Sequence, residues 1–430
     1  MNRYAPLLHN TGFRAIWLAA VISGLGDRIA AIALYLLIYN LTGSPMDLGL
    51  LAATQIVPAI VLGPIAGLVC DRLNRKGIMV VSDLVSAVVV ASIPLVTSTN
   101  QVYLLAVALG CGRQFNGPAR MALMPDVVGR ELIGGANSLL MLTRNVVLLV
   151  GPAVGGLLVA WRGTDPAFWL DAATFLASAA VLALWRQPEM AAPMTLAAAG
   201  GGDTSVTVDG AKPVNPHRTL RQRIGGLWRE ATDGLAGIRD HRGLRMAFGF
   251  FAVITFVTAM QQPLVVVFVK DVLGGGDRQL GFIIAAAGLG GILGALLGGV
   301  AVSRQRPLRV IAVLVALDGA LLFAFAANRN LWVAFAIFAC FGALATLAQI
   351  ALATFLQRTA PDDRRGRTFG WLGTVVGPLS LVAVFLGPML AEFTGVVTVL
   401  AICGAAELLV ALAGSRVDRE TAEPAEGGRN

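Results

Sequence analysis

The sequence predicts an all-α membrane protein with twelve membrane-spanning helices, arranged as two pseudo-symmetric bundles of six. Three observations lead to this prediction: the composition, the length of the apolar segments and the distribution of the basic residues. Of the 430 residues, 56% are hydrophobic and only 13% are charged, whereas a soluble domain carries about 25% charged residues. The net charge of +8 does not indicate nucleic-acid binding, because the basic residues fall in short loops between apolar segments.

Twelve apolar segments can be placed along the chain, each about long enough to cross a bilayer as a helix. They fall near residues 14–40, 47–69, 77–98, 102–124, 138–160, 166–186, 245–269, 279–302, 308–327, 331–356, 369–391 and 396–414. The long interval between the sixth and seventh segments suggests an internal repeat, which is common in transporters. We therefore expect an N-terminal bundle at 1–186, a linker at 187–244, a C-terminal bundle at 245–415 and a tail at 416–430.

The linker has two parts of different composition. It begins with small residues and a glycine run at 200–202, which is typical of a disordered segment. It then becomes rich in arginine, with Leu227 and Trp228 interleaved. This second part predicts an amphipathic helix that lies on the membrane surface.

The basic residues also predict the orientation. If both termini lie inside, the expected outer loops hold only Arg162, Lys270, Arg278 and Arg329 of the 33 basic residues, while Arg28, Arg113 and Arg144 lie within spans. Because positive charge accumulates on the cytoplasmic side, we expect both termini and the linker to face the cytoplasm.

A tight loop joins the second and third segments and carries Gly67, Asp71, Arg72, Arg75 and Lys76. Gly67 lets another helix approach closely, and Asp71 is placed to face the positive N-terminal end of a neighbouring helix. The three basic residues hold the loop on the cytoplasmic side. A second string, Gly151, Pro152, Gly155 and Gly156, predicts a bend in the fifth segment and a close helix contact.

Two charged residues lie deep in the expected membrane. Asp27 lies about 20 Å along the first segment from Arg14, and Arg113 lies about 17 Å from the inner end of the fourth segment, at the helical rise of about 1.5 Å per residue. The two can therefore share one depth. A buried carboxylate beside a cation is suited to binding and releasing protons; a permanent ion pair that only fixes the first helix is the alternative.

These strings together resemble the signatures of the major facilitator superfamily. The string G-x-x-x-D-R-x-x-R-K (Gly67 to Lys76) resembles the family's loop between its second and third helices, and Arg113 with Gly117 resembles its R-x-x-x-G string in helix 4. The string G-P-x-x-G-G at Gly151 resembles the helix-5 signature of its exporters. The resemblance covers about residues 10–415 and points to the drug:proton antiporter branch that includes macrolide and enterobactin efflux proteins.

The resemblance implies a proton-coupled exporter of an amphipathic small molecule in a bacterial plasma membrane, which works by rocking of two halves. It implies that Arg113 takes part in proton transfer, with Asp27 as the carboxylate on a facing, cavity-lining helix. It also implies that Asp126 joins Asp71 and Arg75 in a gate at the inner side. The implied partners are the substrate, protons and membrane lipid; no nucleic acid, cofactor or metal is expected, and the protein is expected to be monomeric.

The expected substrate cavity combines aromatic and amide side chains with few charges, which suits a bulky amphipathic ligand. Its residues are Arg28, Gln55, Phe115, Phe256, Met260, Gln261, Phe338 and Gln349. The seventh and tenth segments contain no acidic residue, so proton coupling is expected to depend on Asp27 almost alone. The other acids that we place at membrane depth, Asp83, Asp318 and Glu407, are expected to pair with arginines of the loops.

Three alternatives remain open. The first is a facilitator or lipid flippase of the same fold without proton coupling. The second is an intramembrane enzyme, for which the sequence offers no cluster of catalytic polar groups. The third is a sensor or subunit that binds a ligand without transporting it.

Overall fold

The computed structural model describes residues 5–129, 131–186, 242–301, 307–359 and 365–420, and within these ranges all regular elements are helices. The helices are α1 (Ala5–His9), α2 (Thr11–Thr42), α3 (Pro45–Arg72), α4 (Arg75–Ser92), η1 (Ile93–Leu95), α5 (Thr99–Val128), α6 (Ile133–Arg162), α7 (Asp165–Leu184), α9 (Arg242–Gln261), α10 (Leu264–Val267), η2 (Phe268–Val272), α11 (Asp277–Ala301), α12 (Pro307–Ala327), α13 (Leu331–Thr359), α14 (Arg365–Thr394) and α15 (Val396–Glu420).

The long helices coincide with the expected spans. Among the described residues, ten helices are long and apolar enough to cross a membrane, or eleven if the bent pair α9 and α10–η2 counts as one span. The expected fourth segment is the long helix α5, which is not among these because Arg113, Gln114 and Asn116 interrupt its apolar sequence. Twelve spans are therefore consistent with the helices, but the hydropathy of the helices alone does not establish that number.

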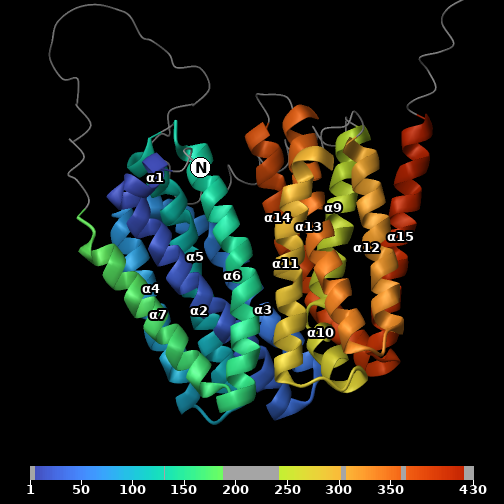
Figure 1. Cartoon of the computed structure of the whole chain (residues 1–430), viewed down its shortest axis with the longest axis horizontal. Helices are drawn as coiled ribbons and strands as arrows, with labels where there is room; N and C mark the ends of the chain where they lie inside the picture. Colours follow the sequence, from blue (N-terminus) through green and yellow to red (C-terminus); the bar gives the residue numbers. More distant parts are fainter. Residues whose placement is uncertain (1–4, 130, 187–241, 302–306, 360–364, 421–430) are drawn as a thin grey trace, which may run out of the picture.

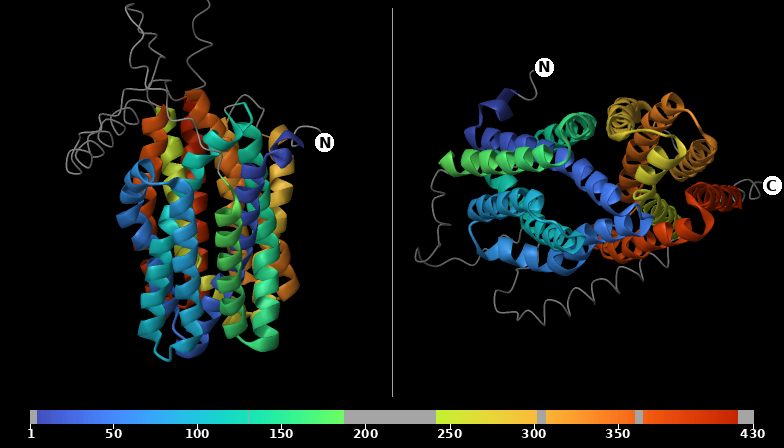
Figure 2. Two further views of the ribbon diagram at one scale, coloured as in Figure 1. Left: turned by 90° about the vertical axis from the view of Figure 1, so that its left-hand side faces the viewer. Right: turned by 90° about the horizontal axis from the view of Figure 1, so that it is seen from below.

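The helices form two bundles, α2–α7 and α9–α15, which we call the N-terminal and C-terminal bundles (Figure 1). The view from below in Figure 2 shows the two bundles side by side. The start of α2 and the end of α15 lie at the same end of the molecule, at the top of Figure 1. We call this the inner end, following the orientation expected from the basic residues, and the opposite end the outer end.

Local chemistry explains where the first helices begin and end. Asn10 caps α2, its side chain accepting a hydrogen bond from the Phe13 amide at 3.0 Å, and Gly43 ends α2 with φ of 65°. The left-handed conformation at Gly43 favours glycine, which lacks a Cβ. Ser44 then caps α3, which starts with Pro45, a residue preorganised for the first helical position.

The seventh expected span is broken, which the sequence analysis did not anticipate. α9 ends at Gln261 and α10 starts at Leu264, with a bend of 47° between them. Pro263 lies at the break and has no backbone N–H to continue the helical hydrogen bonding. The span ends in a π-helical turn, η2, so the backbone at the outer end of this helix is irregular.

Small residues let the two bundles approach each other at two crossings. Where α6 meets α11, a Cβ added to Gly156 would lie 2.7 Å from the Cα atom of Gly281. Where α3 meets α14, a Cβ added to Gly49 would lie 2.6 Å from the carbonyl oxygen of Val384. Figure 1 shows α6 and α11 close together towards the outer end and farther apart towards the inner end.

Several expectations concern parts of the chain that lie outside the described residues. These are most of the linker with its expected amphipathic segment (187–241) and the last part of the tail (421–430). The side chains of Asp71 and Arg72 are also outside the description.

Candidate functional site

Asp27 and Arg113 form an ion pair between α2 and α5. Nη2 of Arg113 donates a hydrogen bond to Oδ1 of Asp27, and its Nη1 donates to Oε1 of Gln55 on α3 at 3.4 Å. The two charged side chains are 27% and 29% exposed, so the pair is partly shielded but reachable. The contact agrees with the depths calculated from sequence. It gives the N-terminal bundle a carboxylate that could exchange a proton beside a fixed cation.

The helix-5 string lies against the same part of α2. A Cβ on Gly151 would collide with the Arg28 side chain, and one on Gly155 would lie 3.0 Å from the carbonyl oxygen of Ile29. Gly156 instead faces α11 of the other bundle. Both α2 and α11 depend on these glycines of α6 for close contact. α6 therefore holds the segment of α2 that carries Asp27 and also forms the interface between the bundles.

A second buried carboxylate lies near the pair and was missed in the sequence analysis. Asp171 on α7 is fully buried and interacts electrostatically with Asp27 and Arg113. α7 can lie directly against α2 because the facing residue is Gly26, where a Cβ would collide with Oδ1 of Asp171. The sequence did contain a signal for this site, because Asp171 is a charged residue that lies six positions into an apolar segment.

Asp83 does not pair with a loop arginine, so that expectation was wrong. Its carboxylate accepts hydrogen bonds from Asn116 on α5 at 2.8 Å and from Ser178 on α7 at 2.6 Å. It is 2% exposed, and the two hydrogen bonds satisfy a group that would otherwise be costly to bury. Asp83 therefore joins α4, α5 and α7 within the N-terminal bundle.

The other two acids lie together in the C-terminal bundle. Glu407 on α15 is fully buried and interacts with Asp318 on α12. The two helices approach closely because Gly319 and Gly404 face each other, and a Cβ on either would lie 2.7 Å from the other's carbonyl oxygen. The acids thus interact with each other across the helix contact, which differs from the expected pairing with loop arginines.

The expected cavity residues have varied surroundings. Gln55 is the second partner of Arg113. Met260 is only 4% exposed and packs against Gly387 of α14. Phe338 packs against Phe325, with ring centroids 5.3 Å apart. The remaining members, Arg28, Phe115, Phe256, Gln261 and Gln349, are partly or largely accessible.

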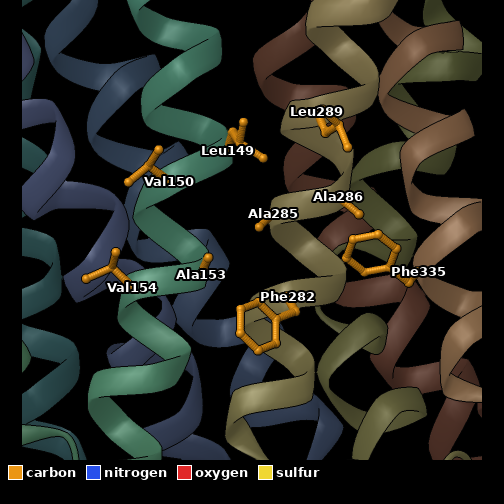
Figure 3. A pocket seen from close by; sticks show the side chains of 9 residues that line it. All are labelled: Leu149, Val150, Ala153, Val154, Phe282, Ala285, Ala286, Leu289 and Phe335. Carbon is orange, nitrogen blue, oxygen red and sulfur yellow. The ribbon is translucent and has the colours of Figure 1, made fainter.

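A separate apolar pocket of about 280 Å³ lies between the two bundles (Figure 3). Its lining comes from α6, α11 and α13 and contains only hydrocarbon side chains: Leu149, Val150, Ala153, Val154, Phe282, Ala285, Ala286, Leu289 and Phe335. None of the expected cavity residues lines it. A pocket without polar groups suits an alkyl chain or an aromatic ring better than a charged group.

At the inner end, the described members of the loop string bind within the N-terminal bundle. Arg75 donates to Asp126 at 2.5 Å and to the Ala122 carbonyl at 2.9 Å, which links α4 to α5. Lys76 donates to the carbonyl oxygens of Ala183 at 3.1 Å and Trp185 at 2.5 Å, at the end of α7. A cation at a helix C-terminus is favourable, so Lys76 stabilises the end of α7.

At the outer end, polar contacts cross between the bundles. Tyr39 of α2 donates to Asp271 of η2 at 2.5 Å, and Lys270 donates to Asn40 at 2.5 Å. Lys270 also pairs with Asp277 at 2.8 Å. We call the Tyr39–Asp271 and Asn40–Lys270 contacts the outer latch. The latch and the small-residue crossings hold the bundles together towards the outer end.

The profile of the Major Facilitator Superfamily matches residues 16–384. The multidrug efflux pump Tap of Mycolicibacterium fortuitum is 29% identical over 400 residues, covering 87% of this chain and 88% of Tap. The enterobactin exporter EntS of Salmonella typhi is 26% identical over 412 residues, covering 92% and 91%.

Among solved structures, the fold is similar to that of a bacterial homologue of the human lysosomal transporter Spinster, in an inward-facing, unoccupied conformation. The TM-score is 0.69 at 17% sequence identity, and the alignment covers 97% of both chains.

Proposed function

The chain belongs to the Major Facilitator Superfamily, and from this membership we propose that it exports an amphipathic small molecule across a bacterial plasma membrane in exchange for protons. That it is a multi-pass membrane transporter follows from the family and its apolar helices. The direction of transport is proposed by analogy with Tap and EntS, whose names describe efflux.

The Asp27–Arg113 pair is the observation that supports proton coupling. Protonation of Asp27 would remove the negative partner of Arg113, and deprotonation would restore it. A substrate that competes with the proton for this site would couple the two movements. The substrate would bind after the proton has left, and the proton would bind after the substrate has left. The pair's partial exposure leaves room for such an exchange.

The contacts between the bundles support alternating access with the described arrangement as the inward-facing state. The outer latch joins the bundles at one end, while the described partners of Arg75 and Lys76 at the other end lie within one bundle. Rocking about the α6–α11 and α3–α14 crossings would open the latch and close the inner end. The loop string would then contribute the inner gate, with Asp71 facing α14.

A facilitator or lipid flippase without proton coupling is the second candidate. The wholly apolar pocket between α6, α11 and α13 favours it, because a lipid chain could occupy the pocket. A facilitator or flippase of this kind needs no titratable group, and neither α9 nor α13 contains an acidic residue.

Ethidium transport in proteoliposomes distinguishes the two candidates. Ethidium is a permanent cation, so a pH gradient alone does not trap it. We expect an acidic interior to drive its accumulation above equilibrium, and a protonophore to abolish that accumulation. Equal equilibration with and without the gradient would instead support the facilitator.

A further inference from the structure

We propose that Asp171 is an alternative partner of Arg113, which receives the guanidinium group when Asp27 becomes neutral. The purpose of this exchange rests on the proposed proton coupling at Asp27. The contacts that make the exchange possible do not depend on that coupling, and they can be tested separately.

Asp171 has unused capacity to accept hydrogen bonds. It is fully buried, and its Oδ2 has no hydrogen-bond donor among the described residues. Its Oδ1 faces the Thr174 hydroxyl at 3.2 Å, but that hydroxyl is closer to the Asp171 carbonyl oxygen, at 2.7 Å. Because a hydroxyl has a single proton to donate, the carboxylate itself is poorly satisfied. Burial of a carboxylate without a hydrogen-bond donor or a cationic partner is costly.

Arg113 has the complementary unused donor. A guanidinium carries five N–H donors, and those on Nη1 and Nη2 contact Gln55 and Asp27. The Nε atom is buried and, in the described part of the chain, has no acceptor. A buried donor without an acceptor and a buried acceptor without a donor therefore occur on two side chains that already interact electrostatically.

The backbone places Asp171 at a suitable depth. It lies 13 residues before Leu184, or about 20 Å from the inner end of α7, while Asp27 lies about 24 Å from the start of α2. Gly26 keeps this approach open, because a Cβ there would occupy the space of the Asp171 carboxylate and the Thr174 hydroxyl.

The other charged groups around α7 have different surroundings. Asp83 of α4 is bonded to Asn116 and Ser178. Arg144 of α6 and Arg28 of α2 are both cations and repel each other. η1 contributes no titratable side chain. Asp27 and Arg113 are thus the charged groups that face Asp171 from the helices packed around it.

The exchange proceeds in one step with a simple balance of charge. Asp27 gains a proton and becomes neutral, Arg113 keeps its proton and charge, and its guanidinium moves from Asp27 to the carboxylate of Asp171. The three groups together gain one positive charge, and the partly shielded cation always has an anionic partner. This matters because a buried charge that loses its partner is strongly destabilising.

A mutant cycle measured by thermal unfolding of the purified full-length protein tests the proposal without a substrate. We expect Asp27→Asn and Asp171→Asn each to lower the unfolding temperature modestly, since one carboxylate remains for Arg113. The double variant should lose roughly 4 °C or more beyond the sum of the single effects. Adding Arg113→Gln to the double variant should recover that excess, because no unpaired cation remains.

Asp83→Asn provides the matched control, since Asp83 is a buried acid of the same bundle with its own donors. Its effect should add to that of Asp171→Asn without an excess. An additive result for Asp27 and Asp171, or no recovery by Arg113→Gln, would overturn the proposal. If the double variant cannot be purified, the yield of folded protein is measured instead. Adding Arg113→Gln to the double variant should restore that yield, and no recovery would overturn the proposal.

The outcomes also separate this proposal from the proposed function. A non-additive cycle in a protein whose ethidium transport ignores the pH gradient would keep Asp171 as the alternative partner and reject proton coupling. An additive cycle in a protein whose ethidium transport responds to the pH gradient would keep proton coupling and reject Asp171 as the alternative partner.

Discussion

Removal of the Tyr39 hydroxyl tests whether the outer latch stabilises the inward-facing state. Tyr39→Phe keeps the ring, which is 7% exposed and lies 5.8 Å from Nζ of Lys270. The change removes only the hydrogen bond to Asp271, at 2.5 Å. Because this bond joins the two bundles, its loss should destabilise one conformation relative to the other and leave each bundle intact.

The size of the effect follows from the nature of the bond. A hydrogen bond to a charged group contributes about 1.5–3 kcal/mol. The Asp271 residue is exposed, so we take the low end, about 1.5 kcal/mol, which corresponds to roughly a tenfold change in an equilibrium constant. We therefore expect the ratio of outward-open to inward-open protein to rise by roughly tenfold.

Distances between spin labels measure this ratio directly. Labels at Leu95, in η1 directly after α4, and at Trp332, at the start of α13, are exposed and lie on different bundles; they would report the separation in a variant without the native cysteines. Tyr39→Phe should enlarge the population with the longer distance.

Tyr103→Phe is the matched control, because the Tyr103 hydroxyl donates to the Asp47 carbonyl at 3.5 Å within the N-terminal bundle. It should leave the distances unchanged. Unchanged distances in Tyr39→Phe would show that the outer latch does not stabilise the inward-facing state.

Three other predictions follow from the crossings, the inner loop and the orientation. Gly288→Leu should abolish ethidium transport and lower the unfolding temperature, because Gly288 lies against the backbone of α6. Gly134→Leu should be tolerated, because Gly134 faces open space. Similar behaviour of the two variants would contradict this prediction. Arg75→Gln should cost at most about 1 kcal/mol of stability, since its ion pair is about one-third exposed; a large loss in thermal unfolding would show that the pair is more important than its exposure indicates. Reporter fusions at Gly202 and Arg329 should give cytoplasmic and external signals respectively, and an external signal at Gly202 would reject the orientation.

The spans were predictable from sequence because each requires a long apolar segment, which is a local property. The contact between Asp27 and Arg113 was also within reach, since helical rise gives the depth of each residue and the family resemblance placed their helices face to face. The break at Pro263 had a local signal that was overlooked, because a proline after two glutamines interrupts both hydropathy and backbone bonding.

Other contacts depend on the tertiary arrangement. Tyr39 and Asp271 are separated by 232 residues, and nothing local to either indicates the other. Lys76 has the sequence of a loop cation, yet it binds the end of α7, because the helix packing brings those carbonyl oxygens to it. The sequence does not show that Asp171 packs against Gly26 of α2, because that contact depends on how α7 lies on α2.

Release of protons on ligand binding tests the central claim, that Asp27 couples proton and substrate movement. Calorimetric titration of the purified protein with ethidium, in buffers of different protonation enthalpy, gives the number of protons released per ligand bound. The wild type should release about one proton per ethidium bound, and Asp27→Asn should bind ethidium with about none released. Equal proton release by Asp27→Asn and the wild type would contradict the account and place the coupling group elsewhere.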